Sequence, residues 1–175
     1  MMKHFARGAA VTTAVLMAGG AAAQVSTNRV AAETDWTVFV ESDPTECWGV
    51  SQPKETVNTR DGQVVSVQRG DILLFVTYRP QDDVQGEISF TGGYPFAEGS
   101  TVNMVIGEDS FELFTDGEWA WPASDAEDAA VAAAMKEGVE AVLTARSSRG
   151  TQTRDTFSLL GFSAASDEAA QRCTS

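Results

Sequence analysis

Carboxylates are the side chains in this sequence with the most capacity for chemistry, because imidazoles and thiols are scarce. The 175 residues include 25 Asp and Glu, two Cys and one His. That histidine, His4, lies in an N-terminal stretch that we expect to be removed. The remaining chain then has no Ser-His-Asp or Cys-His catalysis and no metal site that needs imidazole. We predict no catalytic, cofactor-binding or metal-binding residues.

Carboxylates alone can still catalyse glycoside hydrolysis when they are paired, and their oxygens can bind Ca²⁺. The candidates for Ca²⁺ are Glu108, Asp109 and Glu112, or Asp116 and Glu118, and they lack the spacing of an EF-hand loop. With so many acidic residues, a pair at a useful distance is expected by chance. Ordinary turn residues are the simpler interpretation of the Ca²⁺ candidates.

The two cysteines, Cys47 and Cys173, are a candidate disulfide. In an oxidising compartment an even number of cysteines favours pairing. A bond across so long a loop contributes about 5 kcal/mol by chain entropy, as an upper estimate. Two unpaired thiols are the alternative, and pairing would leave no thiolate nucleophile.

Aromatic residues supply the candidate for binding. Trp119 and Trp121 are two positions apart, so on a strand they share one face. With Tyr94 and Phe96 they form a candidate ligand platform for a sugar ring or a peptide. Packing in the core, or at a rim that closes the fold, is the alternative interpretation.

Residues 1–23 have the pattern of a secretory signal peptide. Lys3 and Arg7 precede the apolar run from Ala9 to Ala18, and small residues lead to a predicted cleavage after Ala23. The run is shorter than the roughly 20 residues of a membrane span. We expect the mature protein in the periplasm, in the outer cell envelope or secreted, with no further membrane span. Its net charge, −13 for the whole chain, disfavours nucleic acid and anionic lipid as partners.

The remaining sequence predicts a flexible lead-in over residues 24–34 and a single domain over residues 35–175. β-branched and aromatic segments alternate with tight turns, most clearly from Glu87 to Pro122. This pattern is typical of an antiparallel immunoglobulin-like β-sandwich, with a small barrel as the alternative. Two short helices are expected in the C-terminal third. One begins with a capping box at Ser124, and the other begins at Ser163 or Ser166 and runs through Cys173.

Three further segments carry expectations about exposure. The run Ile72–Tyr78 is apolar without alternation, which predicts a strand covered on both faces. Lys54 to Arg60 is polar, and we expect it to cross an edge of the sandwich as a connection. The charged residues Arg149, Arg154 and Asp155 are expected to form a set of surface ion pairs, each contributing under about 1 kcal/mol.

Several long motifs resemble the invasion-associated locus B (IalB) family of exported bacterial proteins. The C-terminal Phe157–Ala165, with an L-S-L-x-G-F-like strand before an Ala-rich helix, carries the likeness, as does Trp36-x-Val38 followed by Cys47. A subgroup from marine alphaproteobacteria is especially similar, over RGDILLFV, SFTGGYPFAEGS, FTDGEWAWP and RGTQTRDTFSLLGF (Arg69–Val76, Ser89–Ser100, Phe114–Pro122 and Arg149–Phe162). Many family members have a cysteine at the position of Val40 and a further Cys pair near Trp119–Ala123, which this chain lacks.

The resemblance implies an immunoglobulin-like β-sandwich in the periplasm or on the outer envelope, with no catalytic residues to carry over. Together with the residue chemistry, it predicts a non-enzymatic envelope binding or accessory protein, involved in host or surface interaction. Its partner would be a protein or glycan of the envelope or of a host surface. The alternative function is a carboxylate-dependent hydrolase acting on envelope or extracellular glycans.

Overall fold

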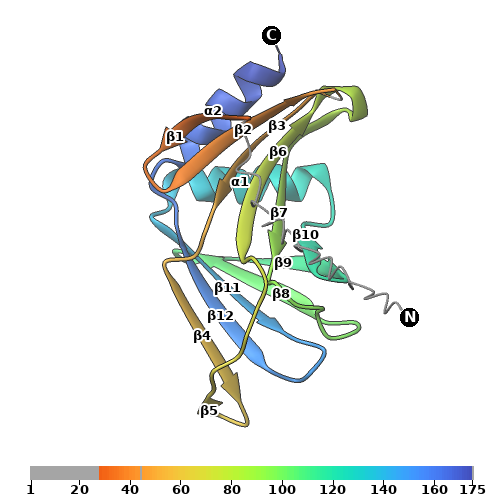
Figure 1. Cartoon of the computed structure of the whole chain (residues 1–175), viewed down its shortest axis with the longest axis vertical. Coiled ribbons are helices and arrows are strands. Elements are labelled where there is room, and N and C mark those ends of the chain that lie inside the picture. The colour runs from red at the N-terminus through yellow and green to blue at the C-terminus, as the bar shows by residue number, and fades with distance from the viewer. Residues whose placement is uncertain (1–27, 44, 175) are drawn as a thin grey trace, which may run out of the picture.

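The computed structural model describes residues 28–43 and 45–174, and the predicted signal peptide lies outside these residues. The described chain forms twelve strands, two α-helices and one 3-10 turn (Figure 1). The strands are β1 (Arg29–Glu33), β2 (Trp36–Ser42), β3 (Thr45–Ser51), β4 (Glu55–Arg60), β5 (Gln63–Val64), β6 (Leu73–Arg79), β7 (Val84–Thr91), β8 (Thr101–Ile106), β9 (Asp109–Asp116), β10 (Trp119–Trp121), β11 (Glu140–Arg146) and β12 (Gln152–Ser158). The helices are α1 (Asp125–Glu137) and α2 (Phe162–Cys173), and the 3-10 turn, η1, is Pro80–Asp82.

The strands make one continuous antiparallel sheet in the order β1-β2-β3-β6-β7-β10-β9-β8-β11-β12-β4-β5. The sheet bends between β7 and β9, so that the half containing β2, β3, β6 and β7 lies across the half containing β8, β11 and β12 (Figure 1). The chain returns from the first half to the second between β3 and β4, where the Lys54 N–H donates to the Thr156 carbonyl at 2.7 Å. The predicted antiparallel β-sandwich with two helices near the C-terminus is confirmed.

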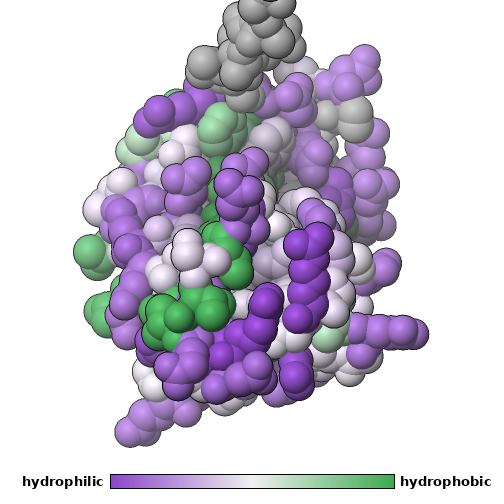
Figure 2. Space-filling view, turned by 60° about the horizontal axis from the view of Figure 1, so that its bottom comes forward, coloured by the Kyte–Doolittle hydropathy of each residue, from purple (hydrophilic) through white to green (hydrophobic). Residues whose placement is uncertain are grey.

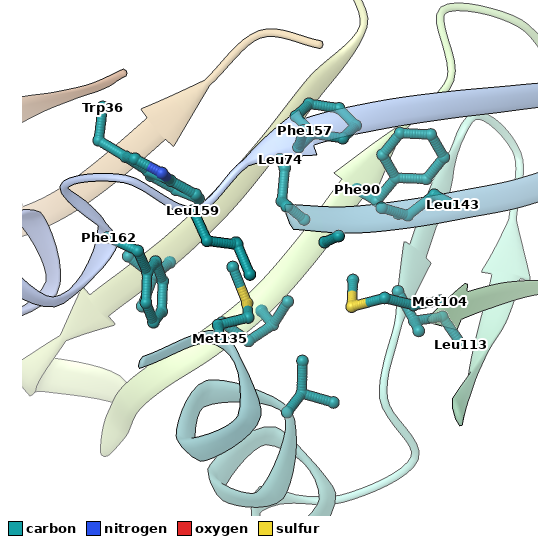
Figure 3. Close-up of a cluster of buried hydrophobic side chains, with 14 of the residues drawn as sticks. Trp36, Leu74, Phe90, Met104, Leu113, Met135, Leu143, Phe157, Leu159 and Phe162 are labelled. Atoms are coloured by element: carbon teal, nitrogen blue, oxygen red, sulfur yellow. The ribbon is translucent and has the colours of Figure 1, made fainter. Parts of the chain in front are cut away.

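The core lies between the two halves and extends under both helices. Figure 3 shows Phe157 and Phe90 along one side of the cluster, and Trp36 and Phe162 at the end where α2 begins. The Phe90 and Phe157 rings pack edge to face at 6.0 Å, and the Trp36 and Phe162 rings at 5.0 Å. All four side chains are fully buried, and each contributes roughly 1.5–3 kcal/mol through apolar burial.

Helix α1 follows the predicted capping box. The Ser124 hydroxyl accepts the N–H of Glu127 at 3.4 Å, and the Glu127 carboxylate accepts the N–H of Ala123 at 2.8 Å. The first bond satisfies an N–H group of the first helical turn, and the second ties the residue before the N-cap to that turn. Val131 and Met135, four residues apart, are buried and turn one side of the helix toward the core.

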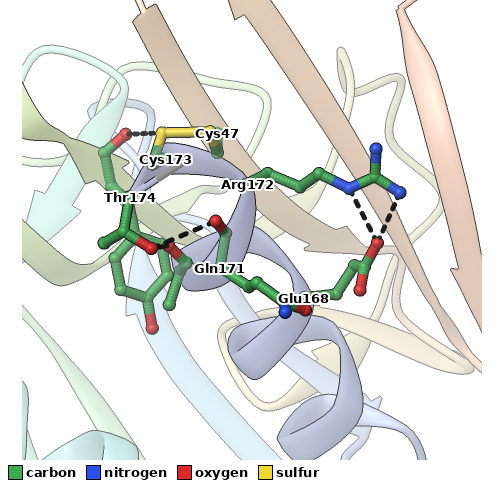
Figure 4. The surroundings of a disulfide bond; sticks show 8 residues. Cys47, Glu168, Gln171, Arg172, Cys173 and Thr174 are labelled. Carbon is green, nitrogen blue, oxygen red and sulfur yellow. Dashed lines mark hydrogen bonds and ion pairs between the residues drawn. A yellow bond between two sulfur atoms is a disulfide. The ribbon is translucent and has the colours of Figure 1, made fainter.

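Helix α2 begins at Phe162, one residue before the earlier of the two predicted starts. Gly161 precedes it with φ of 96°, and a Cβ at this position would lie 1.9 Å from the Glu33 carbonyl oxygen, so only glycine fits. At the other end, Cys173 bonds Cys47 of β3 with an S–S distance of 2.08 Å and a Cα–Cα distance of 5.8 Å (Figure 4). The predicted disulfide is confirmed, and it fastens α2 to the inner face of the first half.

Two strands form where the sequence predicts none. Arg29–Glu33, inside the expected flexible lead-in, is β1 and pairs with β2 at the edge of the sheet. Glu55–Arg60, expected as a connection, is β4 and pairs with β12. Both strands are short, and all of their residues are exposed or half-buried. Neither presents an apolar row to the core, so the alternation that reveals other strands is missing.

Candidate ligand-binding groove

An aromatic groove runs over the outer face of the first half of the sandwich. Four side chains from three strands line it: Trp48 of β3, Phe75 of β6, and Trp119 and Trp121 of β10. We call these four residues and the space between them the outer aromatic groove, which encloses about 390 Å³. Elsewhere, hydrophilic side chains predominate on the molecular face in Figure 2, and hydrophobic groups gather in a few separate patches.

Strand alternation places each of these aromatic residues outside. Trp48 lies between Cys47 and Gly49, which face the core, and Phe75 lies between Leu74 and Val76, which are fully buried. In β10 the buried Ala120 pairs with Phe90, so its two tryptophan neighbours point outward.

The aromatic rings contact one another across the strands. The Phe75 and Trp119 ring centroids are 5.7 Å apart, and the Trp119 and Trp121 centroids are 6.4 Å apart with an interplanar angle of 21°. Trp119 is 40% exposed, and it keeps a large aromatic surface in contact with water. Aromatic surfaces of this kind are enriched at binding sites.

Two hydroxyl side chains form the floor of the groove. Thr77 of β6 and Ser89 of β7 lie on the same face as Phe75, because Phe75 pairs with Ser89 and Thr77 pairs with Glu87. Each residue is only 6% exposed. In the part of the chain that the structure describes, neither hydroxyl has a protein hydrogen-bond partner, and neither is sealed from the groove.

An arginine with three acidic neighbours closes one end of the groove. The Arg79 guanidinium lies 3.1 Å from Glu87, 3.4 Å from Glu46 and 3.7 Å from Asp82. Burial tends to lower the pKa of Arg79, but Glu87 and Glu46 outweigh it and raise that pKa above its ordinary value. This end of the groove therefore presents a fixed cation together with the carboxylate oxygens that surround it.

The structure brings together two of the four predicted platform residues and separates the other two from them. Trp119 and Trp121 line the groove, whereas Phe96 is buried and packs on Phe90 at 6.1 Å. Tyr94 packs on Phe96 at 5.2 Å, and its hydroxyl bonds Thr153. The loop after β7 carries Tyr94 and Phe96 back toward the core. The sequence pattern that grouped them with the two tryptophans did not reveal this.

The sequence-based platform also lacked Trp48 and Phe75. The unalternating run Ile72–Tyr78 predicted a strand covered on both faces, and this is wrong for the outer face, which lines the open groove. Phe75 is an apolar residue on this open face, where it forms part of the groove wall, and it therefore hides the alternation of the strand. One signal in the sequence could have placed Trp48 on the outer face. If Cys47 faces inward to form the predicted disulfide, strand alternation turns the next residue, Trp48, outward.

A second correction concerns Asp155, which was expected on the surface with Arg149 and Arg154. Its side chain is 0% exposed and accepts two hydrogen bonds from Arg69, at 2.6 and 2.7 Å. Arg69, itself 6% exposed, lies 4.9 Å from the centre of the Tyr94 ring. Burial raises the pKa of Asp155, against the opposing effect of the Arg69 guanidinium.

Residues Arg69-Gly70-Asp71 spell an Arg-Gly-Asp tripeptide, the kind of motif that integrins recognise. Its arginine points inward to Asp155, and the Gly70 N–H donates to the Gly93 carbonyl at 2.9 Å. The tripeptide therefore anchors the loop before β6, and its arginine is not displayed for a partner.

Asp128, in the first turn of α1, predicts a pH dependence of stability. Burial raises its pKa from 3.8 to about 6, with Glu87, Asp125 and Glu127 adding to the effect and a bond from the Ile88 N–H opposing it. The folded chain thus holds a proton that the unfolded chain loses between roughly pH 4 and 6, so this group makes stability fall as pH rises through that window.

Asp128→Asn removes this titration and keeps an oxygen for the Ile88 N–H. We expect the variant to be more stable than the wild type at pH 7 by on the order of 1 kcal/mol, reduced for partial solvent screening, and similar to it near pH 4. Urea unfolding at both pH values measures the difference. An equal offset at pH 4 and pH 7 would contradict the assignment.

No group of three or more His, Cys, Asp or Glu within residues 28–43 and 45–174 is arranged to hold a metal ion. Neither helix of this described region has the length and apolar composition needed to cross a bilayer.

These features define a disulfide-linked antiparallel β-sandwich protein with an open aromatic groove on one outer face. The chain belongs to the family described as Invasion associated locus B (IalB) protein, whose family model matches residues 36–170. Its fold is similar to the crystal structure of invasion associated protein b from Bartonella henselae, with a TM-score of 0.56 and 15% sequence identity over 83% of this chain and 98% of that chain. A search of curated protein sequences finds no match.

Proposed function

We propose that this protein is an exported, non-enzymatic binding module of the cell envelope, and that the outer aromatic groove is its binding site. The observation that supports the proposal is the convergence of Trp48, Phe75, Trp119 and Trp121 from three strands on one solvent-facing surface. A sheet that needed only stability would bury such side chains, since exposed aromatic area loses the benefit of apolar burial.

Export is supported by the signal-peptide pattern of residues 1–23 and by the Cys47–Cys173 bond, because disulfides persist in oxidising compartments. The proposed contact with an envelope or host surface comes from the family and its structural relative. The groove supports binding in preference to hydrolysis, since its two carboxylates, Glu46 and Glu87, both bond the same Arg79 guanidinium. Glycoside hydrolysis needs one carboxylic acid that is free to donate a proton.

Replacing the two groove tryptophans tests the proposal. We expect Trp119→Ala/Trp121→Ala to reduce retention of solubilised envelope material on the immobilised protein by more than about ten-fold, because central aromatic contacts dominate binding. The fold should persist, since both side chains lie on the outer face. Retention is measured by quantitative electrophoresis and sugar analysis of the eluate, and folding by circular dichroism.

The matched control is Val139→Ser, which removes an exposed apolar side chain, 72% exposed, outside the groove. It should retain envelope material like the wild type. Undiminished retention by the folded double tryptophan variant would overturn the assignment of the site. Release of reducing sugar ends that is lost in Glu46→Gln or Glu87→Gln would support the hydrolase alternative instead.

A further inference from the structure

We infer that the outer aromatic groove binds an uncharged saccharide, with a sugar ring stacked on Trp119 and its neighbours and hydroxyl groups bonded at the floor and rim. This inference rests on the proposed binding function and specifies the chemistry of the ligand. Five observations support it: the aromatic walls, the floor hydroxyls without a protein partner, the polar rim, the paired strand edges and the negative charge.

The walls match the apolar face of a sugar ring. A pyranose ring presents C–H groups on one face, and these carry partial positive charge that is attracted to the negative face of an aromatic ring. Trp119 contacts both Phe75 and Trp121, so the three rings make one continuous aromatic surface longer than a single indole. A surface of that extent suits an oligosaccharide better than an isolated small group.

The floor supplies the polar half of the match. Thr77 and Ser89 are 94% buried, yet their hydroxyls have no protein partner among the described residues and open into the groove. Because the hydroxyls reach the groove, water can bond them in the free protein, and a ligand that displaces this water must supply the hydrogen bonds in its place. A sugar hydroxyl both donates and accepts, and it satisfies a threonine or serine hydroxyl in either orientation.

The rim extends this polar surface. Arg79 donates toward ligand oxygens, while Glu46 and Glu87 accept from ligand hydroxyls. A purely apolar ligand, such as an acyl chain, would leave the floor hydroxyls and these charges desolvated without partners, and that is costly.

An extended peptide is disfavoured because β3 and β6, the strands that carry Trp48 and Phe75, have no free edge. β3 is paired with β2 and β6, and β6 is paired with β3 and β7 along the groove. On β7 the N–H of Ile88 is already bonded to Asp128. A bound peptide could not add a strand to β3 or β6, so over these strands it would lose the main-chain bonds that peptide recognition usually uses.

Charge excludes the anionic alternatives. The chain carries a net charge of −13, and Arg79, the one cation among the described residues that line the groove, is neutralised by its acidic neighbours. Sulfated or phosphorylated polymers and nucleic acids would be repelled at this surface. The remaining class is a neutral glycan.

The test is a titration of the full mature chain with defined probes, in which binding is measured by tryptophan fluorescence and by calorimetry. The neutral probes are hexamers of N-acetylglucosamine, β-linked glucose and α-linked glucose, and the comparison probes are heparin and a proline-rich peptide. We expect saturable binding of at least one neutral hexamer, with none for heparin or the peptide. Trp119→Ala should weaken that binding by more than about ten-fold.

Thr77→Val distinguishes ligand hydroxyl bonding from simple stacking, because it keeps the shape of the side chain and removes its hydroxyl. We expect it to weaken binding of the neutral hexamer about three- to ten-fold. Thr144→Val, on β11 in the other half of the sandwich, is the matched control and should leave binding unchanged.

Two results would overturn the inference and are distinct from failure of the proposed function. Groove-dependent retention of envelope material without binding of any neutral hexamer, or competition for it by the peptide or heparin, would leave the binding site standing and refute the saccharide. If neither the retention of envelope material nor the binding of a hexamer is weakened by replacing the groove tryptophans, both proposals are refuted.

Discussion

Replacing Cys47 and Cys173 with alanine is expected to lower the free energy of unfolding by about 2–5 kcal/mol, because the bond closes a very long loop. The two cysteines are 126 positions apart and join β3 to the last turn of α2. Without the bond, the unfolded chain regains the entropy of that loop. Urea unfolding of the double variant against the wild type, both under non-reducing conditions, measures the loss.

Other contacts of α2 decide how the variant fails. The Tyr78 hydroxyl bonds Ser166 at 2.8 Å, and Trp36 packs on Phe162, so α2 keeps part of its attachment when the disulfide is absent. We therefore expect a folded but less stable protein whose C-terminal helix is cleaved first in limited proteolysis. Tyr78→Phe is the control, with a change of about 1 kcal/mol. A loss below about 1 kcal/mol for the cysteine variant would show that the cross-link contributes little.

The second large effect is expected from Asp155→Ala, which should destabilise the fold by about 3–5 kcal/mol. The substitution leaves the Arg69 side chain, 6% exposed, without the two short bonds from its guanidinium to its carboxylate partner. The remaining acceptors of Arg69 are neutral: the Gly92 carbonyl at 2.8 Å and Asn58 at 3.3 Å. Thermal and urea unfolding measure the effect.

Asp167→Ala is the matched control, because it removes the carboxylate of an exposed pair with Lys136 at 3.2 Å. Such surface pairs contribute under about 1 kcal/mol. A second variant, Arg69→Met/Asp155→Leu, removes both buried charges and should recover much of the stability. Equal losses for Asp155→Ala and Asp167→Ala would contradict the account of a buried ion pair.

Signals that act over a few residues were sufficient to predict much of this fold. The capping box at Ser124 needs only the next three residues to form, so the sequence reveals it directly. The tight turns between strands depend on equally short signals. The same is true of the two-residue spacing that puts Trp119 and Trp121 on one face of a strand. The Cys47–Cys173 pairing spans the chain, but it was predictable because only two cysteines are present and they can form only one bond.

What could not be predicted depends on which strands become neighbours. Asp155 resembles a surface residue in sequence, and only the arrangement of β12 next to β4 and the Arg69 loop shows that it is buried. The groove has the same origin, since Trp48, Phe75 and Trp119 come from strands that are far apart in sequence and become neighbours through the β3-β6-β7-β10 order. β4 was missed because it is polar and lacks the apolar alternation that marks most strands. Only its pairing with β12 makes it a strand.

The covalent link between β3 and α2 also sets the mechanical path through the molecule. Tension applied at the two ends of the chain travels from the N-terminal hairpin to Cys47, crosses the sulfur atoms and leaves at Cys173. All four aromatic residues of the outer aromatic groove lie between those two positions, in the segment that the disulfide bypasses. We expect pulling to detach β1 and β2 first and to leave the disulfide-closed segment between Cys47 and Cys173 folded. A molecule under tension would then keep its groove intact.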